Sequence, residues 1–264
     1  MPERKHAKAI IGMVHLRPLP GSPRWGGSMA EVLSAAAHDA HALQEGGVDA
    51  VVVENYGDTP FFPGRVPAET VAAMTRAVDE VRRTITLPVG VNVLRNDAAS
   101  ALAVCAATNA CMIRVNVHTG AMLTDQGWIN GSAHETVRIR RHLQLDVAIL
   151  ADILVKHATA PAGLSIEAAA RDTWERGHAD ALIVSGSGTG RPTSPQDAER
   201  TRCAVPDAQI LIGSGLTALN APELLRHADG AIVGTAFKRD GHAETAVSLD
   251  CVRRLMDVVA GISA

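Results

Sequence analysis

The chain has 264 residues, of which 47% are hydrophobic and 20% charged, so it can form one large α/β domain with a sizeable core. A net charge of −3 and an aromatic content of 3% exclude the basic, base-stacking surfaces of nucleic-acid-binding proteins. The four cysteines lack CxxC spacing, so we expect free thiols and a cytoplasmic location. No apolar run approaches the ~18 residues that span a membrane, so we expect no membrane insertion.

Short apolar runs recur along the whole chain, and most of them are β-branched and apolar at successive positions. This pattern is typical of parallel strands that are buried on both faces. The runs predict eight strands, at residues 9–15, 48–55, 88–94, 110–117, 145–155, 179–186, 208–215 and 229–236.

Amphipathic stretches with helix start signals follow these runs. Ser28 precedes Glu31 by three residues, which is the spacing of a capping box, and Ser132 precedes Glu135 by the same distance. Ser194 is expected to cap a further helix. The stretches predict helices from about residue 28 to 47 and at 67–83, 97–108, 132–143, 165–176, 195–204, 220–227 and 243–261.

Eight strands that alternate with eight helices predict a (β/α)8 TIM barrel, with residues 1–264 forming a single domain. A doubly wound open sheet would have fewer strands and a GxGxxG loop after the first one, whereas the first run is followed by HLRPLPGSPRWGG. The active site of such a barrel lies at the carboxyl ends of the strands. The functional residues are therefore expected in the last positions of each run.

Ionisable residues gather at these carboxyl ends. Glu54 and Asp152 each end an apolar run, where desolvation is expected to raise the pKa of a carboxyl group, so both are candidates for proton transfer. The basic residues that follow other runs are candidates for stabilising a developing negative charge. The predicted catalytic residues are Glu54, Asp152, Lys156, Arg114, His157 and Asn116.

Glycine and hydroxyl residues end the last three runs, in the segments VSGSGTG, IGSG and VGTA. In phosphate-binding barrels the loops after the seventh and eighth strands hold the phosphate, because small residues let backbone N–H groups approach its oxygens. The same glycines would also suit tight turns that bind nothing. The predicted substrate and phosphate site, which makes this a barrel of the phosphate-binding type, comprises Ser185, Ser187, Gly188, Thr189, Gly213, Ser214, Gly215, Gly234, Thr235, Asn92 and His15.

Several alternatives stay open at the level of sequence. Glu54 or Asp152 could form a purely structural buried ion pair with an arginine such as Arg114. Lys156 could form a Schiff base. No HxH or HExxH spacing occurs at a strand end, so no metal ligand is assigned and no cofactor is predicted. A divalent metal held by separate strands, or FMN in the phosphate site, is the remaining cofactor alternative.

Two long loops and a phenylalanine pair lie on the same predicted face. Residues 17–27 and 118–131 each carry a tryptophan and are long enough to cover the site. Phe61 and Phe62 follow the second strand, where an exposed pair would favour a subunit contact or a wall of the substrate site. We therefore expect a homo-oligomer.

Five segments have a further meaning when they are taken together: IIGMVHLRPLPGSP, VENYGDTPF, RVNVHTGAMLTDQGWINGSA, ADILVKHA and VSGSGTG. They resemble the BtpA family, which is also called the photosystem I biogenesis or BtpA/SgcQ family, over nearly the whole chain. The resemblance implies a (β/α)8 barrel. Its name implies a role in photosystem I accumulation in cyanobacteria, although relatives occur in non-photosynthetic organisms and some are encoded among sugar-metabolism genes. It implies no catalytic assignment.

Two functions follow from these observations. The cluster of ionisable residues favours an enzyme that acts on a small phosphorylated metabolite, a sugar phosphate or nucleotide-like compound, by lyase, isomerase or glycosyl-transfer chemistry with carboxylate acid–base catalysis. The alternative is a non-catalytic assembly or biogenesis factor that uses the barrel as a scaffold or sensor. The expected partners are the phosphorylated substrate and further copies of the chain, with no nucleic acid.

Overall fold

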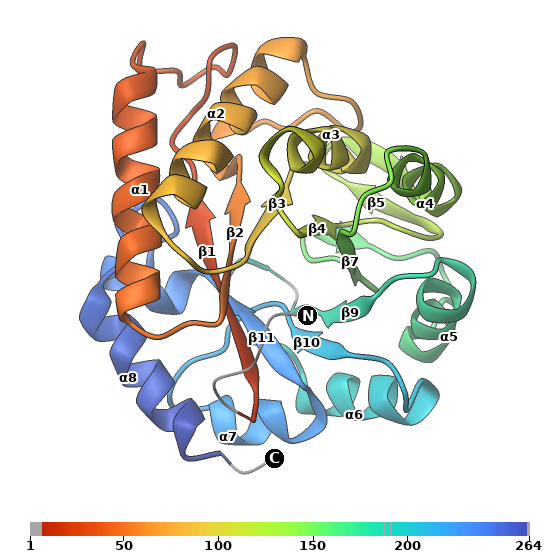
Figure 1. Ribbon diagram of the computed structural model, residues 1–264. Helices are drawn as coiled ribbons and strands as arrows, with labels where there is room; N and C mark the ends of the chain where they lie inside the picture. The colour runs from red at the N-terminus through yellow and green to blue at the C-terminus, as the bar shows by residue number, and fades with distance from the viewer. Residues whose placement is uncertain (1–6, 187, 191, 263–264) are drawn as a thin grey trace.

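The computed structural model describes residues 7–186, 188–190 and 192–262, and within them a parallel sheet closes into a barrel (Figure 1). Its eight strands in this described part follow the order β1-β11-β10-β9-β7-β4-β3-β2, which confirms the predicted (β/α)8 fold. The barrel strands are Ala9–His15 (β1), Ala50–Glu54 (β2), Val89–Asn92 (β3), Met112–Val115 (β4), Ala148–Asp152 (β7), Ala181–Val184 (β9), Ile210–Ile212 (β10) and Gly230–Val233 (β11).

Helices surround the barrel and connect its strands (Figure 1). Ser28 Oγ accepts the Glu31 N–H at 3.3 Å and caps the first helix as predicted. The predicted side-chain caps at Ser132 and Ser194 are wrong, and Ser194 Oγ donates to Gln196 Oε1 instead. The helices are Met29–Glu45 (α1), Ala68–Thr84 (α2), Ala98–Thr108 (α3), Ala133–His142 (α4), Ile166–Arg171 (α5), Pro195–Ala204 (α6), Ala221–Leu224 (α7) and Leu249–Ala260 (α8).

Three predicted helices differ from the structure in extent. The helix expected at 165–176 is α5 followed by a π-helical turn, Asp172–Arg176, and that expected at 220–227 is α7 followed by a 3-10 turn, Leu225–His227. The last helix begins at Leu249 instead of near residue 243, because Ser248 provides its cap by accepting the Cys251 N–H. The residues before it form short 3-10 turns, Thr235–Phe237 and Arg239–Gly241.

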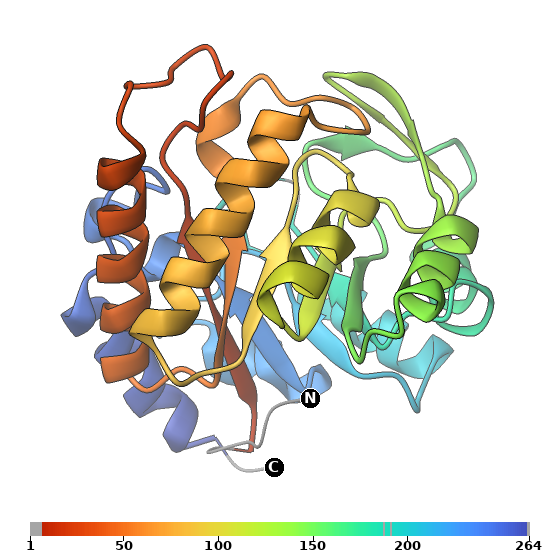
Figure 2. The same ribbon diagram turned by 45° about the horizontal axis from the view of Figure 1, so that its top comes forward.

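The predicted loop at residues 118–131 contains a β-hairpin. Its strands, Ala121–Thr124 (β5) and Gly127–Asn130 (β6), pair with each other, and β5 also pairs with the short strand Ala158–Thr159 (β8). Figure 2 shows the hairpin rising from the same end of the barrel as the β1–α1 and β2–α2 connections. The structure therefore groups these connections at the carboxyl ends of the barrel strands.

The alternation of side chains along each strand determines which residues line the barrel. One apolar cluster fills the interior and includes Met13, Val52, Leu150, Ile183 and Ile232. The intervening strand residues pack beneath the helices in a second, larger cluster. Two positions beyond these and the other interior residues, the same inward face carries His15, Glu54, Asn92, Arg114, Asp152, Ser185, Gly213 and Gly234.

No helix in residues 7–186, 188–190 and 192–262 combines the length and the apolar character that crossing a membrane requires.

Candidate active site

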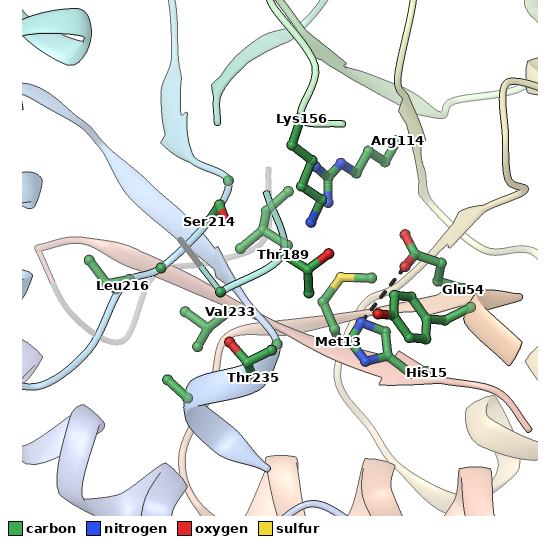
Figure 3. A pocket seen from close by; sticks show the side chains of 17 residues that line it. Met13, His15, Glu54, Arg114, Lys156, Thr189, Ser214, Leu216, Val233 and Thr235 are labelled. Atoms are coloured by element: carbon green, nitrogen blue, oxygen red, sulfur yellow. Dashed lines mark ion pairs between the residues drawn. The ribbon is translucent and has the colours of Figure 1, made fainter. Parts of the chain in front are cut away.

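A small inner pocket lies at the carboxyl end of the barrel (Figure 3). Figure 3 shows Arg114 and Lys156 on one side of this pocket and Glu54 and His15 on another, with Thr189 near its centre. The loops after β10 and β11 form the remaining wall, through residues 213–216 and 232–236. The pocket volume is about 30 Å³. This volume has room for a water molecule or two but is too small for a phosphate group as it stands.

A larger outer chamber of about 530 Å³ adjoins the inner pocket. Its walls include Phe61 from the phenylalanine pair and Asp125 from the hairpin, so these two segments line the chamber, while Phe62 is exposed. The inner pocket and the outer chamber are neighbours, because five residues line both of them. They are Glu54, Tyr56, Arg114, Lys156 and Thr189.

Arg114 and Asp152 form a buried bidentate ion pair. Arg114 Nε donates to Asp152 Oδ2 at 2.9 Å, and Arg114 Nη2 donates to Asp152 Oδ1 at 3.0 Å. The same carboxylate accepts hydrogen bonds from Asn116 Nδ2 at 3.2 Å and from Ser185 Oγ at 2.6 Å. Asp152 lines neither the inner pocket nor the outer chamber. This geometry favours the structural interpretation of Asp152, as the group that orients Arg114, over a role in proton transfer.

Glu54 faces the cavity and is held from one side only. Its Oε2 accepts a hydrogen bond from Asn92 Nδ2, the residue that pairs with it in the sheet register. Its Oε1 lies 3.7 Å from His15 Nε2. The Glu54 side chain is 8% exposed and lines both the inner pocket and the outer chamber, so a bound substrate would meet this carboxylate directly.

His15 is neutral at physiological pH. Its Nδ1 lies 3.2 Å from the Ala243 carbonyl oxygen, so Nδ1 carries the ring proton and Nε2 is an acceptor. Burial, followed by the charges of Lys238 and Lys156, lowers the pKa of His15 to about 3. The His15 Nε2 and Glu54 Oε1 atoms therefore face each other as two acceptors. A substrate hydroxyl between them could donate to either one.

Acid is expected to destabilise the folded protein through His15. Because the folded pKa of about 3 is below the unfolded value of 6.5, the unfolded chain binds the proton first, and stability falls as pH falls from 6.5 toward 3. Between pH 7 and pH 5 the wild type should lose about 2 kcal/mol more of its free energy of unfolding than His15→Gln does. Urea unfolding of both proteins at the two pH values measures this difference. An equal loss in the two proteins would contradict the neutral His15.

Lys156 places a basic amine in the lining of both the inner pocket and the outer chamber. Burial, followed by the neighbouring Arg114 charge, lowers the pKa of Lys156 to about 8. Among the described residues no carboxylate lies within 4.0 Å of its ammonium group. The group thus combines a charge at neutral pH with readily lost protonation, as a reacting lysine requires.

Thr189 connects the loop after β9 to two other loops. Its N–H donates to His157 Nε2 at 3.0 Å, and its Oγ1 lies 2.9 Å from the same atom, so this imidazole nitrogen is unprotonated. Burial and the Lys156 charge lower the pKa of His157, consistent with a neutral ring. Thr189 also hydrogen-bonds Tyr56, whose ring stacks on that of His15 at 4.6 Å. These contacts hold Thr189 over the inner pocket.

The predicted phosphate-site residues do not all present free groups to the pocket. Ser185 Oγ binds Asp152, and Ser214 Oγ donates to the Gly188 carbonyl at 3.0 Å. A Cβ at Gly213 would approach Ser185 Oγ to 2.6 Å, so packing alone requires glycine there. Three further predicted residues, Gly215, Gly234 and Thr235, line the pocket. Asn92 acts through Glu54, and Ser187 lies outside the described residues.

The predicted catalytic and binding residues did not include Tyr56 or Arg95, which both line the site. Tyr56 is the single tyrosine of the chain and follows Glu54 by two positions, which is the signal that could have identified it. Arg95 follows the third strand and is a strand-end cation in the sequence, but it was not assigned to the site; the structure places it in the lining of the outer chamber. His118, at the start of the predicted loop 118–131, lies outside both cavities, and its Nε2 contacts the Gly177 carbonyl at 2.8 Å.

Within the described ranges 7–186, 188–190 and 192–262, no three His, Cys, Asp or Glu side chains group closely enough to hold a metal ion.

Solved structures with this fold include N-(5′-phosphoribosyl)anthranilate isomerase from Pyrococcus furiosus, with a TM-score of 0.59 and 11% identity over 97% of this chain and all of the other. Thiamine phosphate pyrophosphorylase from the same organism has a TM-score of 0.57 and 15% identity, and covers 96% of this chain and 95% of its own. At such low identity these similarities support the barrel fold alone.

Curated relatives match much more closely. Photosystem I biogenesis protein BtpA of Synechocystis is 47% identical over 251 residues, which is 95% of this chain and 88% of the relative. The sgc region protein SgcQ of Escherichia coli is 36% identical over 96% of this chain and 94% of its own length. The sequence model of the BtpA family matches residues 6–261. This chain therefore belongs to the BtpA family.

Proposed function

We propose that this chain is an enzyme that acts on a small phosphorylated metabolite, with the phosphate in the inner pocket and the reacting carbon atoms beside Glu54 and Lys156. The observation that carries the proposal is that a carboxylate and an ammonium group, with no ion pair between them, both line the inner pocket and the outer chamber. These two charges would be unfavourable in a purely structural core, because their desolvation costs free energy that no ion pair between them offsets.

The proposed chemistry uses only groups of the chain itself. Glu54 accepts a proton from the substrate, and Lys156 and Arg114 stabilise the negative charge that develops on an adjacent oxygen. Aldol cleavage, isomerisation and glycosyl transfer all require a base and a stabilised anion or leaving group in this arrangement, so the proposal covers these three reaction classes. The Asp152 carboxylate keeps the Arg114 guanidinium in a fixed orientation.

The glycine-rich wall supports a phosphate in the inner pocket. Gly215 has φ +67° and Gly190 has φ +72°, so neither position readily accepts a side chain. A Cβ at Gly190 would lie 3.3 Å from Thr235 Oγ1 across the pocket. Since the pocket is too small for a phosphate as it stands, the proposal includes an outward shift of residues 188–190, which would release the Thr189 contacts with His157 and Tyr56.

Phosphorylated ligands are expected to stabilise the wild type and not Gly215→Asp. A ligand at 100 times its dissociation constant adds about 2.7 kcal/mol of stability, or roughly 5–10 °C in Tm for a chain of this length. The aspartate places a negative charge in the anion pocket and should abolish the shift. Thermal unfolding with inorganic phosphate, glycerol 3-phosphate and ribose 5-phosphate measures it.

Gly47→Asp is the matched control for that variant. Gly47 also has a positive φ of +91°, but it precedes β2 at the opposite end of the barrel and has no atom within 4 Å of an added Cβ. It should show the same strain as Gly215→Asp and keep the ligand shift. If no phosphorylated compound raises the Tm of the folded wild type, the proposed phosphate site is wrong.

A second candidate is an assembly factor, because one relative is named a photosystem I biogenesis protein. The hairpin exposes Trp128 and Leu123, with 58% and 43% of their surface accessible, and apolar side chains of this kind suit a protein contact. An absence of ligand shifts, together with self-association that is lost in Trp128→Ser, would favour this candidate. Light scattering measures that association and also tests the proposed homo-oligomer.

The cytoplasm is the compartment that we propose for this chain. Its four cysteines, Cys105, Cys111, Cys203 and Cys251, are all free thiols, which a reducing environment maintains.

A further inference from the structure

Arg95 is a buried cation with no carboxylate in contact with it among the described residues. The residue is only 4% exposed, and it lines the outer chamber. Nη2 donates to the Lys156 carbonyl oxygen at 2.6 Å, whereas the buried Nε–H has no acceptor. Among the described residues no carboxylate comes within 4.0 Å of the guanidinium. A guanidinium has five N–H donors, and a single hydrogen bond within the described part of the chain uses only one of those of Arg95.

The carboxylates that line the outer chamber, and the nearby Asp152, all have other partners or lie too far away to neutralise Arg95. Asp152 is occupied by Arg114, and Glu244 pairs with Arg24 at 2.8 Å on the exposed rim. Asp125 is exposed and accepts a hydrogen bond from Gln126. Glu54 accepts its hydrogen bond from Asn92. Burial lowers the pKa of Arg95, and the charges of Asp152, Asp125 and Glu54 partly oppose this shift. The guanidinium stays charged, because an arginine does not lose its proton in a protein.

Arg95 and Lys156 are two cations that line the outer chamber side by side. The Arg95 hydrogen bond to the Lys156 backbone brings the two residues together, and both side chains line the chamber. A buried charge of this kind costs stability unless an anion compensates it. A planar arginine fork matches the two oxygens of a carboxylate, and a neighbouring ammonium adds a further charge-assisted hydrogen bond.

We propose that Arg95 and Lys156 bind a carboxylate of the substrate in the outer chamber, so that the substrate is a phosphorylated carboxylic acid. This inference rests on the proposed function, which places the phosphate of the same molecule in the inner pocket. Glu54 and Asp125 line the same chamber, and their negative charges favour a singly charged carboxylate over a second, doubly charged phosphate. The roughly 530 Å³ of the chamber accommodates a small organic acid.

The test compares matched compounds that differ by the carboxylate alone. Isothermal titration calorimetry measures the dissociation constants of 3-phosphoglycerate against glycerol 3-phosphate, and of 2-phosphoglycerate against glycerol 2-phosphate. At least one acid should bind the wild type about 10- to 100-fold more tightly than its partner, which is the strength of hydrogen bonds to a charged group. Arg95→Gln should remove that preference and leave the affinity for the glycerol phosphates within about threefold.

Two further proteins control this comparison. Arg76→Gln removes an exposed arginine from α2 and should keep the preference. Arg95→Lys keeps the charge but loses the planar fork, so it should retain only part of the preference for the acid. This variant provides the test if Arg95→Gln does not fold.

The outcomes separate the inference from the proposed function. Equal binding of both members in each pair overturns the carboxylate site and leaves the phosphate site standing. A preference that persists in folded Arg95→Gln also overturns it. Failure of all four compounds, together with inorganic phosphate and ribose 5-phosphate, overturns the proposed function and the inference with it.

Discussion

Asp152→Ala is expected to destabilise the folded protein by about 3–5 kcal/mol, because it leaves the Arg114 guanidinium charged and buried without its partner. The Arg114 side chain is 3% exposed, so water cannot replace the lost carboxylate. Asn116 Nδ2 and Ser185 Oγ lose their acceptor as well. Urea unfolding at pH 7, followed by circular dichroism, measures the change in the free energy of unfolding.

A surface ion pair provides the control for this prediction. The Asp79 carboxylate forms an ion pair with Arg83, one turn along α2, at 2.8 Å, and the Asp79 side chain is 48% exposed. Asp79→Ala should therefore cost no more than about 0.5 kcal/mol. If Asp152→Ala costs as little as Asp79→Ala, Arg114 is not held by this pair, and Asp152 becomes available again as a proton-transfer group.

Glu54→Gln is expected to lower kcat by about 10²- to 10⁴-fold while the dissociation constant of the substrate changes little. Glutamine has the same shape and can still accept the hydrogen bond from Asn92, so the pocket should keep its structure. It cannot accept a proton at neutral pH, which removes the proposed base. The measurement is steady-state turnover of whichever phosphorylated acid the calorimetric comparison identifies, alongside its affinity for the variant.

Glu31→Gln is the matched control for Glu54→Gln. Glu31 lies at the start of α1, its carboxylate is 70% exposed, and it lines neither the inner pocket nor the outer chamber. Its replacement should leave kcat within about twofold of the wild type. A folded Glu54→Gln protein with wild-type turnover would assign proton transfer to another group, and Lys156 would be the next candidate.

The sequence could predict the barrel because the information for it is local. Each strand is a short run of β-branched apolar residues. Because such a strand is buried on both faces, it can be recognised from its own residues without knowledge of its neighbours in the sheet. The order of the strands then follows from right-handed βα connections between neighbours. The hairpin at 121–130 escaped prediction, since its β-propensity lies in a glycine-rich segment that becomes a strand pair only above the barrel.

The candidate site was predictable to the same extent. Strand-end logic selected Glu54, Arg114 and Asp152, because an inward side chain of a strand is followed two residues later by another inward one, and it selected Lys156 as a cation that follows the fifth run. It could not decide between the two carboxylates. That decision depends on the lateral distance from β4 to β7, which brings Arg114 onto Asp152 and leaves Glu54 beside Asn92.

By itself, the sequence determined the periodic features of this protein: the alternation of strands and helices, the end of the barrel where polar residues gather, and the resemblance to its family. Tertiary structure alone decided which charges meet. Ion pairing, burial and pKa depend on distances of a few ångströms between residues that are far apart in the chain, as for Arg95 and Lys156, which contact each other across 61 positions. Periodicity carries no record of those distances, so the paired Asp152, the neutral His15 and the uncompensated Arg95 became visible only in the folded chain.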